Sequence, residues 1–381
     1  MLSGPRGAQV GEFLQQVKND FKAPIVAAVI NNEIHELSYP VDMESRCIPV
    51  TMDMADGARI YRRSLVFLLE MAFADLFPTG KLTIDHSLSS GGFYCQVTGR
   101  GELLQDELDA LKVHMKKLVD EDHPYERKEI PAQEAIDYFN KLGYDDKVRL
   151  FAYRKKDYVT LYSLNGQMDY MHGYMVPSTG YLRWFDLNLI NGGFTIQFPR
   201  RHAPTDLEPM GNYPKLINTF RQYGDWLTSL NIDNVGALND AVISGRADEL
   251  VLVSEALHEQ NVAEIAQQIA QKNSRIILIA GPSSSGKTTT SRRLAIQLLA
   301  RGIRHREQME CRGVPAALAE IIIGRHRARR ADNLIGLDPG AVGMPRTDEF
   351  ERPRQRIAIL DRLLRLSRHA RHEHSRNGNP S

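Results

Sequence analysis

Apolar and polar positions along the first part of the chain alternate with the periods of short strands and amphipathic helices. Residues 10–21 have helical spacing, and two apolar runs meet at Asn31-Asn32, a pair that is typical of a hairpin turn. An apolar strand follows at 48–54. This order of one helix, a hairpin and a further strand predicts a small β-grasp-like α/β module over residues 1–55.

Residues 56–230 group their helices and strands in separate runs. The pattern begins with a long apolar helix that ends at Pro78, continues with alternating strands, and then repeats this order. Such grouping predicts an α+β domain. We expect helices at 61–77, 107–122 and 132–144, and strands at 81–88, 91–99, 148–154, 158–164 and 184–201.

Helical periodicity returns in a connector at residues 231–272, which leads into a short apolar strand, a glycine-rich loop and a second helix at 273–303. The loop follows the phosphate-binding pattern G-x-x-x-x-G-K-[ST], in the strand-then-helix context that this pattern requires. It consists of Gly281, Pro282, Ser283, Ser284, Ser285, Gly286, Lys287, Thr288 and Thr289.

The residue types in this loop suit a triphosphate. Gly281 and Gly286 allow the backbone to curl so that N–H groups point at the phosphates, at the positive end of the following helix. Lys287 adds a charge near the β- and γ-phosphates, and the Thr288 hydroxyl is a ligand for Mg²⁺. We therefore expect this segment to bind a nucleoside triphosphate, with ATP and Mg²⁺ as cofactors.

The composition, with 42% hydrophobic and 25% charged residues, is that of a globular protein, and no apolar run approaches the length of a membrane span. The first residues contain no apolar stretch of the kind that a secretory signal needs. Cys47, Cys95 and Cys311 are too few and too far apart for a disulfide framework. These features predict a cytoplasmic protein with no membrane partner, and they do not indicate an oligomeric state.

The overall charge of +1 conceals a change in residue usage near position 300. Residues 301–381 contain 17 arginines and no lysine, whereas the preceding residues use both. Translation in an altered reading frame would produce an arginine-rich sequence of this kind. We expect residues 304–381 to be an atypical, poorly ordered tail.

Two stretches together resemble a known architecture. The motif Val-Pro-Ser-Thr-Gly at 176–180, with residues 85–92 ahead of Phe93-Tyr94, is similar to the second additional domain of threonyl-tRNA synthetase. The preceding segment resembles the TGS module that comes before that domain. Residues 245–295 resemble the P-loop part of bacterial nucleoside kinases of the uridine kinase and phosphoribulokinase type, in which these modules follow one another. The resemblance covers about residues 10–303 and implies an incomplete P-loop NTPase domain.

The resemblance implies transfer of the γ-phosphate of ATP to a nucleoside 5′-hydroxyl, with uridine as the expected acceptor. Such a kinase needs a catalytic base and an arginine-rich lid, and the sequence after Ile303 offers neither in recognisable form. Asp338 and Asp361 are the nearest candidates for the base. No catalytic residue is therefore assigned, and we expect little or no kinase activity. The alternative is a non-catalytic regulator that binds a nucleotide or RNA through the TGS-like and synthetase-like domains.

The synthetase editing domain binds zinc through two histidines at i, i+4 on a helix and a later cysteine and histidine. In this chain those positions are Arg63, Phe67, Met171 and Met175. Guanidinium, phenyl and thioether groups do not replace imidazole and thiolate as ligands of Zn²⁺. We expect neither zinc binding nor editing hydrolysis here, although His172 lies beside these positions.

Overall fold

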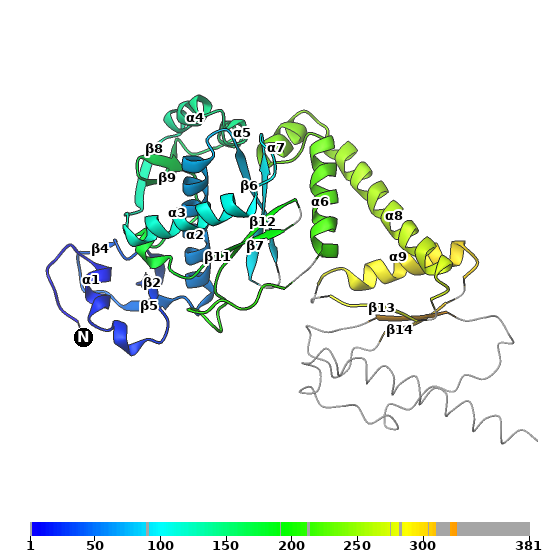
Figure 1. The fold of residues 1–381 in the computed structure, drawn as a ribbon, viewed down its shortest axis with the longest axis horizontal. Coiled ribbons are helices and arrows are strands. Elements are labelled where there is room, and N and C mark those ends of the chain that lie inside the picture. The colour runs from blue at the N-terminus through cyan, green and yellow to red at the C-terminus, as the bar shows by residue number, and fades with distance from the viewer. Residues whose placement is uncertain are drawn as a thin grey trace, which may run out of the picture. The chain divides into compact units, whose positions relative to one another are not determined.

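The chain forms two compact units, Met1–Arg246 and Ala247–Ser381 (Figure 1). The computed structural model describes residues 2–88, 91–190, 192–211, 214–274, 276–281, 284–303, 305–309 and 321–325. Every strand pair within these ranges is antiparallel. No helix within them has the length and apolar character needed to cross a membrane.

The N-terminal part of the first unit combines one short helix with a three-stranded sheet in the order β3-β2-β5. Its elements are β1 (Ala8–Gln9), α1 (Val10–Gln15), the 3-10 turn η1 (Lys18–Asp20), β2 (Ile25–Ile30), β3 (Glu33–His35), β4 (Pro40–Val41) and β5 (Cys47–Thr51). Strand β2 is apolar throughout because it is buried on both faces, by α1 and by the following long helix. The expected hairpin is confirmed, since Asn31 and Asn32 have φ angles of 49° and 73°.

The centre of the first unit is a four-stranded sheet in the order β11-β12-β7-β6, with two helices packed against it. Its elements are α2 (Ala55–Leu76), β6 (Lys81–Leu88), β7 (Gly92–Thr98), α3 (Gln105–Asp120), β11 (Asp186–Ile190), β12 (Gly193–Gln197) and a later helix, α6 (Pro214–Ser229). A β-bulge interrupts the register of β6 between Ile84 and Ser87. Ile84 packs in the main core with α2, whereas Leu88 packs with Ile217 of α6, so the bulge allows one strand to serve two clusters.

A smaller three-stranded sheet, in the order β10-β9-β8, carries two short helices on one face. The strands are β8 (Glu126–Pro131), β9 (Tyr158–Leu164) and β10 (Gln167–Asp169), and the helices are α4 (Ala132–Lys141) and α5 (Asp145–Ala152). This part of the unit also contains the 3-10 turn η2 (Thr179–Tyr181) and helix α7 (Val235–Ile243). The strand expected at 148–154 is wrong, because helix α5 occupies most of this segment. Asp145 and Asp146 suit the positive end of a helix, and Phe151 packs on Phe139 with 5.6 Å between ring centroids.

The second unit pairs two helices and a small sheet in the order β13-β15-β14. Its elements are α8 (Ala247–Gln271), β13 (Ile276–Ile279), α9 (Lys287–Ala300), β14 (His305–Met309) and β15 (Ile321–Arg325). Helix α9 ends just before Gly302, which has a φ angle of 73° and is followed by a hydrogen bond from the Ile303 N–H to the Leu298 carbonyl. A doubly wound nucleotide-binding domain is built on parallel neighbours, and the described strands here pair antiparallel instead.

Most of the expected tail lies outside the described residues. This applies to Asp338 and Asp361, which were the candidates for a catalytic base, and to Cys311. Only strands β14 and β15 are described beyond position 304, and the remaining expectations for that segment stay predictions.

Two helical glycines provide a matched test of this packing. A Cβ added at Gly57, near the start of α2, would lie 2.1 Å from the carbonyl oxygen of Thr51 in β5. Gly57→Ala therefore forces α2 away from β5, and we expect it to lower the free energy of unfolding by about 1–3 kcal/mol. An added Cβ at Gly224 in α6 would have no neighbouring atom within 4 Å.

Gly224→Ala is therefore expected to raise the free energy of unfolding by about 0.5–1 kcal/mol, because alanine loses less backbone entropy in a helix. Urea unfolding of the full chain, followed by circular dichroism, measures both variants. Equal effects of the two substitutions would contradict the close approach of α2 to β5.

Candidate nucleic-acid interface

The loop between β10 and η2, residues 170–178, is held by one turn of helix α2. The Nη1 atom of Arg63 donates a hydrogen bond of 2.5 Å to the Tyr174 carbonyl oxygen. The Ser64 hydroxyl accepts a hydrogen bond of 2.9 Å from the Val176 N–H. Both loop groups are backbone groups, so they fix the path of the chain directly. We call this segment the 170–178 loop.

The N-terminal module holds the same loop from a second side. The Oε1 atom of Glu36, just after β3, accepts hydrogen bonds from the Met175 N–H at 3.2 Å and from the Tyr162 hydroxyl. Burial, followed by the nearby Glu36 carboxylate, raises the pKa of Tyr162, which keeps this hydroxyl a neutral donor. One carboxylate thus connects the N-terminal module, strand β9 and the loop.

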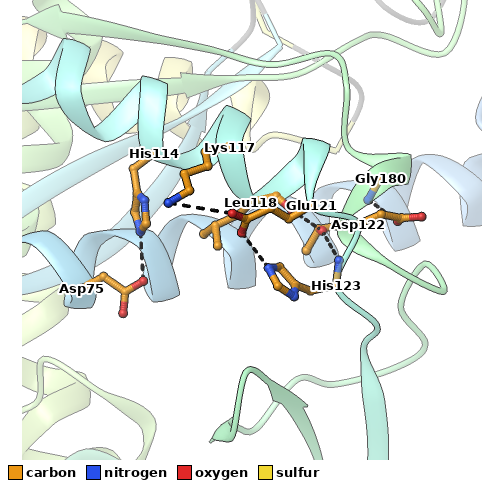
Figure 2. Close-up of polar contacts among 9 residues, drawn as sticks. Asp75, His114, Lys117, Leu118, Glu121, Asp122, His123 and Gly180 are labelled. Atoms are coloured by element: carbon orange, nitrogen blue, oxygen red, sulfur yellow. Dashed lines mark hydrogen bonds and ion pairs between the residues drawn. The ribbon is translucent and has the colours of Figure 1, made fainter.

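The end of the loop is fastened to helix α3, as Figure 2 shows. The Thr179 hydroxyl donates to the Leu118 carbonyl at 2.6 Å and accepts from the His123 N–H at 2.9 Å. The Asp122 Oδ1 atom accepts from the Gly180 N–H at 2.9 Å. These contacts satisfy backbone groups at the C-terminal end of α3 and give the chain a fixed exit from the loop.

Ion pairs along the exposed side of α3 complete this network (Figure 2). His114 of α3 lies 2.9 Å from Asp75 of α2 and so joins the two helices. Glu121 pairs with His123 at 2.8 Å and with Lys117 at 3.8 Å. The hydrogen bond from His123 is the first cause of a lowered pKa at Glu121. These pairs are solvated, so they orient the helix end and add little stability.

The four positions that carry zinc ligands in the editing domain have other roles here. Phe67 and Met175 are fully buried in the main core, and Met171 packs against that core. The guanidinium of Arg63 contacts the loop backbone, and His172 is exposed. Within the described residues, no group of three or more His, Cys, Asp or Glu side chains could hold a metal ion. Apolar packing and one arginine therefore stand where zinc coordination would need imidazole and thiolate.

The ring of Tyr174 in the loop lies near two rings of the N-terminal module. The His35 ring lies 4.0 Å from the Tyr39 ring and 6.2 Å from the Tyr174 ring, measured between centroids. Tyr39 is 39% exposed, and Arg127 of β8 places its guanidinium carbon 5.8 Å from the Tyr174 ring centroid. We call His35, Tyr39 and Tyr174 the aromatic row. It offers faces on which a planar base or a guanidinium can stack.

Arginines from α2 surround the same region. Burial lowers the pKa of Arg63, and the nearby charges of Arg59 and Arg62 lower it further, although the Tyr162 side chain acts in the opposite direction. The charges of Arg59 and Arg62 act on Arg63, so these three guanidinium groups lie near one another on one helix. Arg59 pairs with Asp56 at 2.8 Å, and the Arg62 guanidinium carbon lies 5.5 Å from the Phe198 ring centroid. Arg63 and Arg127 are the two that contact Tyr174. We call Arg59, Arg62, Arg63 and Arg127 the arginine group. Guanidinium groups bind phosphates in bidentate fashion, and aromatic rings stack on unpaired bases.

Sequence reasoning did not find this interface. The aromatic row joins residues that are far apart in the chain, and only folding brings His35 close to Tyr174. The one available signal was Arg63, which was noticed as a departure from a zinc ligand. Its guanidinium donates a hydrogen bond to the Tyr174 carbonyl.

The residues of the glycine-rich loop lie in the strand–loop–helix order that the sequence predicts. Gly286 precedes helix α9 with a φ angle of 77°, and Ser284 has a φ angle of 60°. Lys287 is the first residue of α9, and the Thr288 carbonyl accepts a hydrogen bond of 3.0 Å from the Ser291 hydroxyl.

An added Cβ at Gly281 would lie 2.8 Å from the Ser285 hydroxyl, so a larger residue there would require the Ser285 side chain to move. Pro282 and Ser283 lie outside the described residues. The described part of the loop therefore places Ser285, Lys287 and Thr288 at the positive end of a helix.

The chain is similar in sequence to parts of several threonine–tRNA ligases. It is 30% identical over 179 residues to that of Lawsonia intracellularis, an alignment that covers 47% of this chain and 28% of the relative. It is 32% identical over 170 residues to that of Acidithiobacillus ferrooxidans, covering 44% and 26%, and 29% identical over 171 residues to that of Thermotoga petrophila, also covering 44% and 26%. No protein-family model matches the chain.

These similarities correct one expectation and support another. The expected assignment to the nucleoside kinases, with a nucleoside as phosphoryl acceptor, is wrong, because the relatives are threonine–tRNA ligases. The expected threonyl-tRNA synthetase-like domain is supported. The chain spans little more than a quarter of the length of these curated relatives. The chain thus contains a domain similar to part of threonine–tRNA ligases.

Proposed function

We propose that this chain is a non-catalytic RNA-binding regulator, and that its first unit binds tRNA or a tRNA-like RNA. The supporting observation is the placement of Arg63 and Arg127 beside Tyr174 of the aromatic row, in a chain that is similar to parts of threonine–tRNA ligases. Guanidinium groups would contact phosphates, and exposed ring faces would stack on unpaired bases. Both kinds of contact are needed to bind single-stranded ends or loops of an RNA.

The proposal excludes editing hydrolysis because the zinc positions carry other chemistry. Phe67 and Met175 contribute apolar packing, and Arg63 uses its guanidinium on the loop backbone. The 170–178 loop is therefore held by protein contacts and needs no metal to keep its shape. A site that is fixed by protein contacts and has no zinc ligands at these positions suits recognition of an RNA better than editing hydrolysis.

The division of the chain into modules is part of the same proposal. Residues 1–55 would be a TGS-like module and 56–230 a domain like the second additional domain of the synthetase. Residues 231–272 would connect them to the segment at 273–303, and 304–381 would form the tail. The Glu36 contacts to Tyr162 and Met175 support a fixed relation between the first two modules.

Arg127 and Lys128 provide a matched test, because successive side chains of β8 point to opposite faces. Arg127 lies over the Tyr174 ring, whereas Lys128 pairs with Glu126 at 2.7 Å. We expect Arg127→Ala to weaken binding of a threonine-accepting tRNA about tenfold, which corresponds to about 1.4 kcal/mol. Lys128→Ala removes the same charge and should change the affinity less than about twofold. Fluorescence anisotropy with labelled tRNA measures both.

Salt dependence separates this interface from general attraction. The slope of log affinity against log salt concentration is proportional to the number of phosphates that the protein contacts. If Arg127 contacts a phosphate, Arg127→Ala should therefore make this slope shallower by the amount that one phosphate contact contributes. Equal losses for the two variants would indicate attraction without a site. Absence of tRNA binding by the unaltered chain would refute the proposal.

We further propose that the segment Gly281–Thr289 binds a nucleoside triphosphate with Mg²⁺, without phosphoryl transfer to a nucleoside. The described geometry supports this, since Lys287 and Thr288 begin a helix of 14 residues whose positive end faces the loop. ATP and Mg²⁺ are also consistent with the similarity to ligases, a class of enzyme that couples bond formation to cleavage of a nucleoside triphosphate. A nucleotide bound here would be a second ligand of the proposed regulator, in addition to RNA.

Lys287 and Arg292 allow a comparison on one helix. Lys287→Ala removes the charge proposed to lie at the β- and γ-phosphates, and we expect it to weaken MgATP binding at least tenfold. Arg292→Ala removes an exposed cation farther along α9 and should leave the affinity within about twofold. Isothermal titration of the full chain with MgATP measures both. No heat of binding in the unaltered chain, or equal losses in the variants, would contradict the nucleotide site.

A further inference from the structure

Two carboxyl groups and one ammonium group meet beneath the 170–178 loop. Asp169, the last residue of β10, forms an ion pair with Lys147 of α5, and their side chains are 11% and 22% exposed. The Oδ1 atom of Asp169 also accepts a hydrogen bond of 2.5 Å from the Tyr170 N–H. Glu70 of α2 forms a hydrogen bond with the Asp169 side chain. The beginning of the loop is thus attached to both α2 and α5.

The Glu70 carboxyl is poorly placed to carry a negative charge. Its Oε2 atom is shielded from solvent and has no hydrogen-bond partner, although other parts of the residue are partly exposed. A buried carboxylate oxygen without a donor carries a large desolvation cost. A protonated Glu70 would instead donate a hydrogen bond to the Asp169 carboxylate, because an ionised carboxylate can accept but cannot donate.

The charges around Glu70 also favour retention of one proton. Asp169 and Asp146 bring negative charge, and Lys147 is the cation that faces the pair in the described residues. The Lys147 ammonium also lies 5.1 Å from the Phe139 ring centroid and 4.7 Å from the Tyr144 ring centroid.

The remaining titratable neighbours are uncharged near neutral pH. Burial raises the pKa values of the Tyr144 hydroxyl and of the Cys95 thiol, which faces Glu70 from β7. One ammonium therefore faces two carboxyl groups, so ionising both would leave an uncompensated charge in a shielded site.

We propose that Glu70 and Asp169 share a single proton, and that this proton fastens the 170–178 loop to α2, which makes Glu70 a positioning residue for Tyr174. We call these two residues the carboxyl pair. The effect on RNA rests on the function proposed above, whereas the sharing of the proton does not. Loss of the proton would place two negative charges beside Lys147 and push β10 away from α2.

The direction of the pH dependence follows from the burial of Glu70. Burial, followed by the nearby Asp169 charge, raises the pKa of Glu70 to about 8 in the folded chain. The opened loop would expose Glu70 with an ordinary glutamate pKa of about 4.3. Because the folded state holds the proton more tightly, attachment of the loop is strongest at low pH and is lost as the pH rises through about 8.

Hydrogen exchange of the loop amides in wild-type and Glu70→Gln protein tests this proposal. Glutamine is neutral at every pH and keeps a donor for Asp169, so its loop should not respond to pH through this site. We expect the ratio of opening constants, wild type over Glu70→Gln, to rise for Met175 and Val176 by up to about tenfold per pH unit below about pH 8, and then to level off. Comparing the two proteins at each pH cancels the intrinsic exchange rates.

Two controls make the comparison specific. The Ile303 amide, which donates to the Leu298 carbonyl in the second unit, should show the same exchange in both proteins. Glu129→Gln alters an exposed glutamate of β8 and should leave the loop amides as in wild type. A ratio at Met175 and Val176 that does not change with pH would overturn the proposal.

A measurement on unaltered protein decides the matter even if Glu70→Gln does not fold. With ¹³C in the glutamate carboxyl groups, the Glu70 resonance should titrate well above the exposed glutamates. Titration together with them would overturn the shared proton.

Binding of tRNA at pH 6 and pH 9 forms a separate arm of the test. The affinity of wild type should fall relative to Glu70→Gln as the pH rises, because Tyr174 loses its fixed place. If exchange responds to pH and the relative affinity does not, the shared proton stands and the role of Glu70 in RNA binding is refuted. Failure of wild type to bind tRNA at pH 6 refutes the proposed function alone.

Discussion

Helix α2 is the element on which the first unit depends, because it is buried on most of its circumference. Apolar residues along it, such as Leu65, Leu68 and Leu69, have no exposed surface. A helix that is apolar nearly all round must be covered from several directions. The N-terminal sheet, the four-stranded sheet and helix α3 provide that cover, and each is therefore positioned relative to α2.

The polar groups of α2 follow from the same constraint. Buried polar side chains are stable where they have hydrogen-bond partners, and for Tyr61, Ser64 and Arg63 these partners include backbone groups of distant segments. Tyr61 donates to the Trp184 carbonyl at 2.8 Å and accepts from the Trp184 N–H at 3.0 Å. The Ser64 hydroxyl accepts from the Val176 N–H at 2.9 Å, and Arg63 donates to the Tyr174 carbonyl at 2.5 Å. The loops at the proposed interface thus take their shape from the helix that forms the core.

Much of the fold could be predicted from local patterns. Strands β6 and β9 agree with the predicted bounds, and the Asn31-Asn32 turn was predicted from residue type. These features are set by period-two alternation or by a required backbone angle, so they are visible over a few residues. Strand β8 was missed because its charged residues are exposed and carry no alternation.

Helix α5 shows the limit of pattern reasoning. Its apolar residues are too few to distinguish a helix from a strand, and the decision depends on Phe151 meeting Phe139 in α4. The candidate interface was harder still to predict, because His35, Arg127 and Tyr174 form it only when the fold brings them together. A motif that is contiguous in sequence, such as the loop at 281–288, is easily found and also easily over-interpreted. It suggested a kinase that the relatives of this chain do not support.

The resemblance places Arg63, Phe67 and Met175 at positions that bind zinc in the editing domain, and this difference has a physical consequence for the proposed function. Zinc ligands must converge on one point, which fixes a loop but leaves an electrophile in its centre. Here buried side chains and backbone hydrogen bonds fix the loop, and the centre is filled. The positive charge of arginine is then available at the edge of the site, where it can meet a phosphate but cannot activate water. The proposed RNA-binding surface is therefore one whose shape depends on protein contacts and not on a metal ion.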